Sequence, residues 1–120
     1  MRKLAYKRTD RIKSVVIKEV AKLLEEMNDP RATFVTITYA EITSDLDLAK
    51  IYYSVLTAEK KIEAEKMFED AAGYIRSHLA GKLNLRKALK LRFIYDDFLE
   101  QAVRVTDLLD KIKDETKNSK

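Results

Sequence analysis

Few residues of this chain have side chains suited to chemistry on a substrate. His78 is the single histidine, and the absence of cysteine excludes disulfides, thiol catalysis and cysteine-ligated zinc. The two glycines, Gly73 and Gly81, stand eight residues apart, so the chain has neither of the glycine-rich loops that cradle nucleotide phosphates. A lone imidazole is more often structural or solvent-facing than catalytic. We therefore expect a protein without enzymatic activity, catalytic residues or a cofactor.

Two pairs of aspartates are the remaining candidates for a reactive or metal-binding site. Asp45 with Asp47, and Asp96 with Asp97, offer the oxygen ligands that hard cations prefer. Each pair falls at a predicted turn or strand end, where aspartate commonly caps a helix or bonds to the backbone. The sequence favours this structural role, and we expect no metal site.

The distribution of charge points to a polyanionic partner. The net charge is +4, but residues 1–22 carry eight Lys or Arg against two acids, and residues 71–95 carry six against none. Residues 96–116 reverse this, with seven acids against three bases. Such segregation gives one basic side that attracts nucleic acid, although basic residues that merely solvate helix faces remain an alternative. The residues that we expect to contact RNA are Arg2, Lys3, Lys7, Arg8, Arg11, Ala71, Ala72, Gly73, Arg76, Lys82, Arg86, Lys87, Lys90 and Arg92.

Aromatic residues offer a second way to hold unpaired bases, by stacking. In "IYYSVL", Tyr53 alternates in phase with Ile51 and Val55, which assigns it to the core. Tyr52 shares the other strand face with Lys50 and is the better stacking candidate.

Hydrophobic periodicity predicts the elements that position these residues. Helical spacing covers residues 10–27 and ends near Pro30, which lacks an amide hydrogen. Two strands joined as an antiparallel hairpin are expected at 33–42 and 48–57, two helices between 58 and 83, a strand at 89–95 and a last helix at about 98–113. The order α-β-β-α-α-β plus a C-terminal helix predicts an α+β domain with a three-stranded sheet and helices on one face, as in type II KH-like domains. We expect residues 1–113 to form one domain and residues 114–120 to be a flexible polar tail.

The three small residues Ala71, Ala72 and Gly73 interrupt the helical pattern. Glycine costs about 1 kcal/mol relative to alanine inside a helix, and it often marks a kink or a close approach. A bend here would leave an open notch for a ligand; equally, small residues allow tight packing of the helices on the sheet. Gly81 fits either a packing contact or a weak point near the helix end.

The ordered motifs resemble the ribosome-binding factor A family. They are "KRTDRI" (7–12), "DPR" (29–31), "FVTIT" (34–38), "SDLDLAKIYYSVL" (44–56), "AAGYIRSHLAGKLNLR" (71–86), "LRFIYDD" (91–97) and "RVTDLL" (104–109). The resemblance implies a type II KH-like domain in which an Ala-x-Gly kink, matched by Ala71–Gly73, replaces the Gly-x-x-Gly loop. Ser44 and Leu89 stand where members of the family usually carry proline, and the second change makes the start of the third strand less certain.

This resemblance implies a cytoplasmic assembly factor that docks onto the small (30S) ribosomal subunit and its 16S rRNA precursor during late maturation. Other assembly factors or ribosomal proteins are further possible partners, and no membrane partner or oligomer is expected. The lack of cysteine and of a secretory signal fits a cytoplasmic location. Two other hypotheses stay open: a module that holds a basic protein through the acidic final helix, and an RNA-processing enzyme, for which the sequence shows no machinery.

Overall fold

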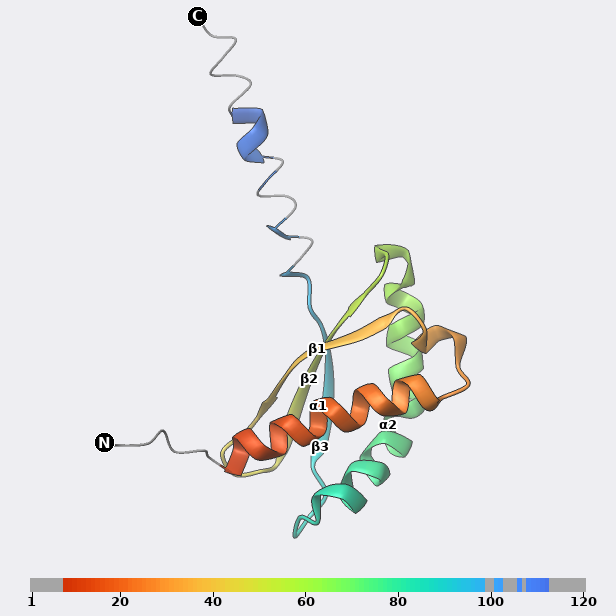
Figure 1. Cartoon of the computed structure of the whole chain (residues 1–120), viewed down its shortest axis with the longest axis vertical. Helices are drawn as coiled ribbons and strands as arrows, with labels where there is room; N and C mark the ends of the chain where they lie inside the picture. The colour runs from red at the N-terminus through yellow and green to blue at the C-terminus, as the bar shows by residue number, and fades with distance from the viewer. Residues whose placement is uncertain (1–7, 99–100, 103–105, 107, 113–120) are drawn as a thin grey trace, which may run out of the picture.

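A computed structural model describes residues 8–98, 101–102, 106 and 108–112 (Figure 1). Its elements are α1 (Arg8–Glu26), the short 3-10 helix η1 (Pro30–Ala32), β1 (Val35–Ile42), β2 (Leu48–Val55), η2 (Ala58–Lys60), α2 (Lys61–Leu83) and β3 (Lys90–Tyr95). The predicted first helix and three strands are confirmed, with ends that shift by one or two residues. Within the described residues, no helix is long and apolar enough to cross a membrane.

The sheet is mixed, in the order β1-β2-β3. β1 and β2 are antiparallel neighbours, as the hairpin predicts, with Val35 opposite Val55 and Ile42 opposite Ala49. β3 runs parallel to β2, which requires a long crossover, and α2 provides it.

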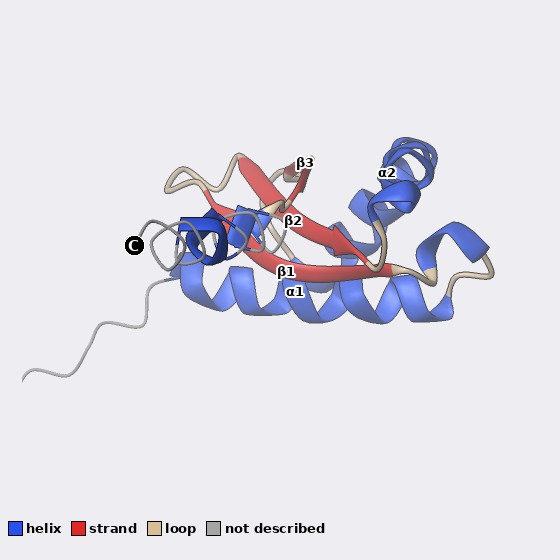
Figure 2. Cartoon of the chain, turned by 90° about the horizontal axis from the view of Figure 1, so that it is seen from above, coloured by secondary structure: helices blue, strands red, loops and turns tan. Residues whose placement is uncertain are grey.

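One face of the sheet carries the core. Every second residue of β2 is buried, namely Ala49, Ile51 and Tyr53, and these side chains meet the buried faces of α1 and α2. Phe68 of α2 stacks on Phe93 of β3 with ring centroids 4.3 Å apart. In Figure 2, α1 lies along β1 and α2 lies toward β3. The opposite face of the sheet is left uncovered by both helices.

α2 corrects one prediction. The segment 58–83 contains one continuous α-helix after a short 3-10 turn, so Ala71–Gly73 does not separate two helices. The ribbon nevertheless changes direction where its colour passes from green to teal (Figure 1). The small-residue segment therefore belongs to a bent helix whose hydrogen-bonded turns are not interrupted.

The C-terminal segment is helical wherever it is described, as expected from its periodicity. Its apolar side chains are exposed, however: Phe98 by 69%, Leu108 by 59%, Leu109 by 58% and Ile112 by 51%. They add nothing to the core. Val105 and the tail 114–120 lie outside the described residues.

Candidate nucleic-acid interface

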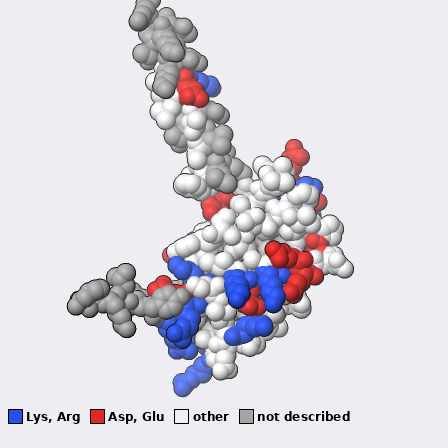
Figure 3. Space-filling view, in the orientation of Figure 1, with Lys and Arg blue, Asp and Glu red and all other residues white. Residues whose placement is uncertain are grey.

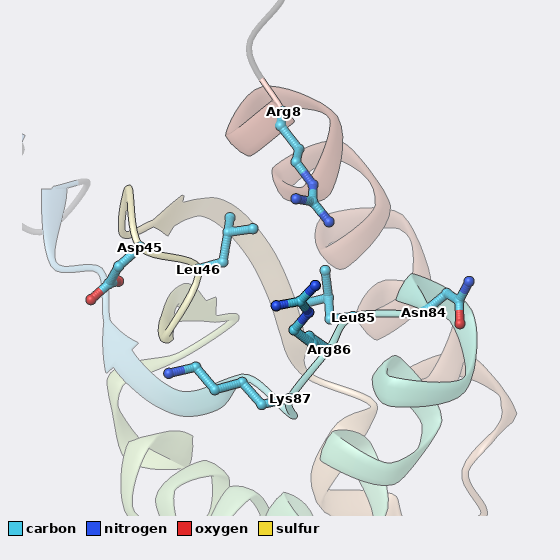
Figure 4. Close-up of a pocket in the computed structure, with 7 residues that line it drawn as sticks. All are labelled: Arg8, Asp45, Leu46, Asn84, Leu85, Arg86 and Lys87. Carbon is cyan, nitrogen blue, oxygen red and sulfur yellow. The ribbon is translucent and has the colours of Figure 1, made fainter.

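A hollow of about 710 Å³ lies where three segments meet at one end of the molecule. It is lined by Arg8 at the start of α1, Asp45 and Leu46 in the hairpin turn, and Asn84, Leu85, Arg86 and Lys87 in the loop after α2. Figure 4 shows Arg8 and Arg86 reaching toward one another into this hollow, while Lys87 extends toward the turn that carries Asp45. The fold thus joins the two basic clusters at Arg8 and Arg86, which are 78 residues apart in the sequence. We call these three side chains, Arg8, Arg86 and Lys87, the basic end.

Two residues with positive φ shape the walls of the hollow. Asn84 ends α2 with φ 53° and ψ 45°, and its N–H donates to the carbonyl of Ala80 over 3.3 Å. Asparagine tolerates this left-handed conformation better than most residues. Leu46 has φ 59° in the hairpin turn, which is costly for a leucine. Both turns reverse the chain tightly and so bring the loop and the hairpin together.

Carboxylates beside the hollow form ion pairs with some of the lysines at this end of the molecule. Asp47 lies 3.3 Å from the amine of Lys87 and 3.7 Å from that of Lys90. A hydrogen bond from the hydroxyl of Thr43 lowers the pKa of Asp45, with a further contribution from the backbone N–H of Asp47. Among the described residues, Arg8 and Arg86 have no carboxylate within ion-pair distance. Within the described residues, the positive charge of these two arginines is therefore not offset by a carboxylate at ion-pair distance.

The basic surface continues along the helices. Arg76 and Lys82 are exposed on α2, as predicted. Lys82 and Lys22 of α1 both lie close enough to Glu19 to lower its pKa, although the main cause is the hydrogen bond from His78. Nε2 of His78 lies 2.9 Å from Oε1 of Glu19. The histidine therefore links α2 to α1, which is the structural role that the sequence favours.

Lys18 and Lys22 are basic residues that the predicted site omits. Both are exposed on α1, four residues apart, and this spacing places them on one helix face. The four-residue spacing of Lys18 and Lys22 was the feature of the sequence that could have identified them as part of a basic helix face. Figure 3 shows Lys and Arg over the lower and left part of this view and Asp and Glu gathered on its right. In this view, basic and acidic side chains therefore gather on different parts of the folded domain.

The structure does not bring all predicted residues together. Lys90 and Arg92 are exposed on β3, and Arg92 lies opposite Lys50 on the sheet face that the helices leave open. Arg11 is exposed on the first turns of α1. The remaining N-terminal candidates, Arg2, Lys3 and Lys7, lie outside the described residues.

The small residues Ala71, Ala72 and Gly73 differ in which of the two roles they fit, packing on the sheet or leaving an open notch for a ligand. Ala71 is only 8% exposed and belongs to the core, and Ala72 is partly buried. Gly73 is exposed, has no positive φ, and a Cβ added to it would meet nothing within 4 Å. Packing thus accounts for Ala71, whereas no contact in the described structure requires glycine at 73. Gly81 is equally open, which excludes the packing contact considered for it.

The "DPR" motif fastens α2 beside this segment. Asp29 caps η1 by accepting from the backbone N–H of Arg31 over 2.9 Å, and its carboxylate also accepts from Nη2 of Arg31 over 2.7 Å. These side-chain hydrogen bonds hold the pKa of Asp29 below its ordinary value. Nη1 of Arg31 donates to Asp70 over 3.0 Å. A single arginine thus ties the loop after α1 to the residue that precedes Ala71.

The aspartates considered for a metal have structural partners. Asp45 accepts from the Thr43 hydroxyl over 2.7 Å, and Asp96 accepts from the backbone N–H of Phe98 over 3.0 Å. Asp97 accepts from the side-chain amide of Gln101 over 2.9 Å. The described part of the chain contains no cluster of three or more potential metal ligands.

Comparisons with known proteins bear on the whole chain. The family model described as ribosome-binding factor A matches residues 8–109. The chain belongs to this family. Ribosome-binding factor A from Neisseria meningitidis serogroup C is 35% identical over 108 residues, which are 89% of this chain and 88% of the relative. Its counterpart in Nitrosomonas eutropha is 38% identical over 88% of this chain and 92% of that protein.

Solved structures of ribosome-binding factor A confirm the fold. The crystal structure of the Thermus thermophilus protein has a TM-score of 0.65 at 17% identity and covers 74% of this chain and 97% of its own. The Thermotoga maritima solution structure, described as a putative member, has a TM-score of 0.51 at 28% identity, over 78% of this chain and 92% of its own. A Thermus thermophilus homology model fitted into a cryo-electron microscopy map of a 30S complex has a TM-score of 0.58 at 18% identity, over 70% and 90%.

Ser44 and Leu89 are the two positions where the resemblance to the family led us to expect proline. Ser44 is exposed in the hairpin turn, and the hairpin forms with serine there. Leu89 is 3% exposed and joins the core immediately before β3 begins at Lys90. Burial of this leucine therefore anchors the start of the strand.

Proposed function

We propose that this protein binds the small ribosomal subunit and its 16S rRNA precursor during late maturation, as an assembly factor that catalyses no reaction. Membership of the ribosome-binding factor A family supports this, as does the 30S complex into which a Thermus thermophilus relative was fitted. The observation that carries it is the basic end, where Arg8 and Arg86 converge on one hollow. Such a factor works in the cytoplasm, where subunits mature.

The proposed mechanism is binding by charge and shape. Arginine forms two parallel hydrogen bonds with a phosphate group, and two arginines on a concave surface can hold consecutive phosphates of a folded RNA. The exposed cations Lys18, Lys22, Arg76 and Lys82 extend the contact along the helices. Gly73 has no side chain and open space around it, which leaves the surface of α2 low at this position, so an RNA backbone can approach the helix closely there.

A pair of charge reversals tests the basic end. Arg8→Glu with Arg86→Glu removes two phosphate contacts, and counterion release predicts an affinity for 16S precursor RNA about 25- to 60-fold lower at 0.1 M salt. The slope of log affinity against log salt should become shallower by about 1.4 to 1.8. Lys66→Glu with Lys111→Glu is the matched control, because it makes the same change in net charge at exposed positions outside the hollow. Equal losses in the two variants would refute a site at the basic end.

Sedimentation tests the proposed partner. In a gradient of cell extract, the protein should migrate with immature small subunits and leave mature ribosomes largely free of it. The reversal at Arg8 and Arg86 should shift it toward the top of the gradient, whereas the control reversal should not. Migration with mature 70S ribosomes, or with no ribosomal particle, would contradict the proposed function.

A second candidate function rests on the exposed apolar residues of the C-terminal segment. Leu108, Leu109 and Ile112 are exposed close to Asp110 in the sequence, and apolar side chains with an acidic neighbour suit a basic protein partner. Leu108→Ser with Leu109→Ser should then release a ribosomal protein that stays bound after nuclease treatment. Retention of every nuclease-resistant partner by this variant would exclude the candidate.

A further inference from the structure

Two tyrosines meet on the open face of the sheet. Tyr39 of β1 lies opposite Tyr52 of β2, and their ring centroids are 5.9 Å apart with the planes inclined at 45°. Tyr39 is 47% exposed, and Tyr52 is partly exposed. Ile94 of β3 lies opposite Tyr52 on its other side. An apolar row thus crosses the three strands on the face that α1 and α2 do not cover.

A β-bulge brings Tyr39 to this face. From Val35 to Ile37 the strand alternates regularly, and continued alternation would turn Tyr39 toward the core with Ile37. The register shifts between Ile37 and Tyr39, so that Tyr39 faces outward and Ala40 takes the core position with 0% exposure. Bulges re-aim side chains and often lie beside functional sites. Here the bulge exposes a large aromatic ring and buries the alanine that follows it.

The charges around the tyrosines favour an anionic ligand with an aromatic part. Lys50 lies in register with Arg92 on the neighbouring strand, and the amine of Lys13 lies 4.9 Å from the centre of the Tyr39 ring. Two carboxylates are also present: Glu41 lies opposite Lys50 in the pairing of β1 with β2, and Asp96 follows β3. The Tyr52 hydroxyl lies at 3.5 Å from Glu41, and the Thr38 hydroxyl donates to Asp96 over 2.8 Å.

We infer that the open face of the sheet is a second RNA-binding surface, distinct from the basic end, which stacks an unpaired base on the Tyr39–Tyr52 pair. Lys50 and Arg92 lie one row along the sheet, where they can meet the phosphate that flanks this base. The inference rests on the proposed function, since it assumes an RNA partner. A base in a duplex has both faces occupied by its neighbours, so only single-stranded RNA can use the platform.

Tyr52→Leu tests the platform, with Tyr52→Phe as its matched control. The leucine removes the aromatic face and stays apolar, whereas phenylalanine keeps the ring and loses only the hydroxyl. Fluorescence anisotropy would measure the affinity of the full chain for a labelled mixed-sequence single strand of about 12 nucleotides and for a fully paired RNA duplex. We expect Tyr52→Leu to weaken binding to the single strand at least about 5-fold, and to leave binding to the duplex unchanged. Tyr52→Phe should bind both probes as the wild type does.

The reversal at Arg8 and Arg86 separates failure of this inference from failure of the proposed function. If the reversal weakens both probes but Tyr52→Leu weakens neither, the sheet face is no RNA surface and the proposed function stands. If neither change affects RNA, both proposals fail. Equal losses of affinity for the duplex and the single strand in Tyr52→Leu would also overturn the platform. So would a Tyr52→Leu variant that binds both probes normally yet no longer joins immature subunits, because that result indicates a protein partner. Tyr39→Leu, on the edge strand, replaces Tyr52→Leu if thermal melting shows that the latter is unfolded.

Discussion

Replacing Gly73 with alanine distinguishes a glycine required by the fold from one retained for a ligand. Gly73 lies in the middle of α2, far from both helix ends, and is exposed to solvent. Its φ is not positive, and an added Cβ would have open space around it. Alanine is favoured over glycine by about 1 kcal/mol inside a helix. Because no described contact opposes this gain, Gly73→Ala should stabilise the free protein.

The size of the effect follows from the length of the chain. Unfolding entropy is about 2.1 cal/mol/K per residue near the melting temperature, so 120 residues give about 250 cal/mol/K. A gain of about 1 kcal/mol then raises Tm by about 4 °C. Gly81→Ala is the matched control, since it lies in the same helix and is equally open.

Thermal unfolding and RNA binding together decide between the roles. We expect both alanine variants to raise Tm, and Gly73→Ala alone to weaken binding to 16S precursor RNA, because its methyl group occupies the low surface of α2. A lower Tm for Gly73→Ala beside a higher one for Gly81→Ala would refute the reasoning. It would show that the bend of α2 depends on the glycine backbone itself.

Three further outcomes follow from the structure. Hydrogen bonds in the folded protein lower the pKa values of Glu19, Asp29 and Asp45. The stabilisation that these carboxylates give the fold is therefore complete above the ordinary pKa values of 4.5 for Glu and 3.8 for Asp, and it is lost as the pH falls through the lower folded values. Tm measured from pH 6 to about 2 should fall most steeply below about pH 4.5, and less steeply in Asp29→Asn; parallel Tm curves for the wild type and this variant would contradict this account. Ala71→Leu should lower the free energy of unfolding in urea by about 1–3 kcal/mol, because Ala71 is packed in the core. An unchanged urea midpoint would mean that the core beside α2 can accommodate the larger side chain. Ile51→Ala should cost about 2–5 kcal/mol, and a loss below about 1 kcal/mol would place the core elsewhere.

The pattern of apolar residues was sufficient to predict most elements, because helix and strand periods differ and each element must bury one face. The α1 positions from Ile12 to Leu24 and the alternation of Ile51 and Tyr53 are local signals of this kind. The end of α1 was equally readable, since Pro30 cannot donate a hydrogen bond. The separation of α2 at Gly73 was wrong because one glycine costs only about 1 kcal/mol, which packing on both sides of it can offset.

The sequence by itself determined the number of basic and acidic residues and the order of the first helix and the three strands, because these depend on residue identity and local period. Tertiary structure decided which of the basic residues share a site. It joined Arg8 to Arg86 at one hollow and turned Arg92 to the opposite face, because strand pairing and helix packing fix these neighbours across long sequence separations. It also decided the position of Tyr39: the apolar alternation changes phase between Ile37 and Ile42, but only the pairing with β2 shows that the shift lies before Tyr39 and turns this ring outward.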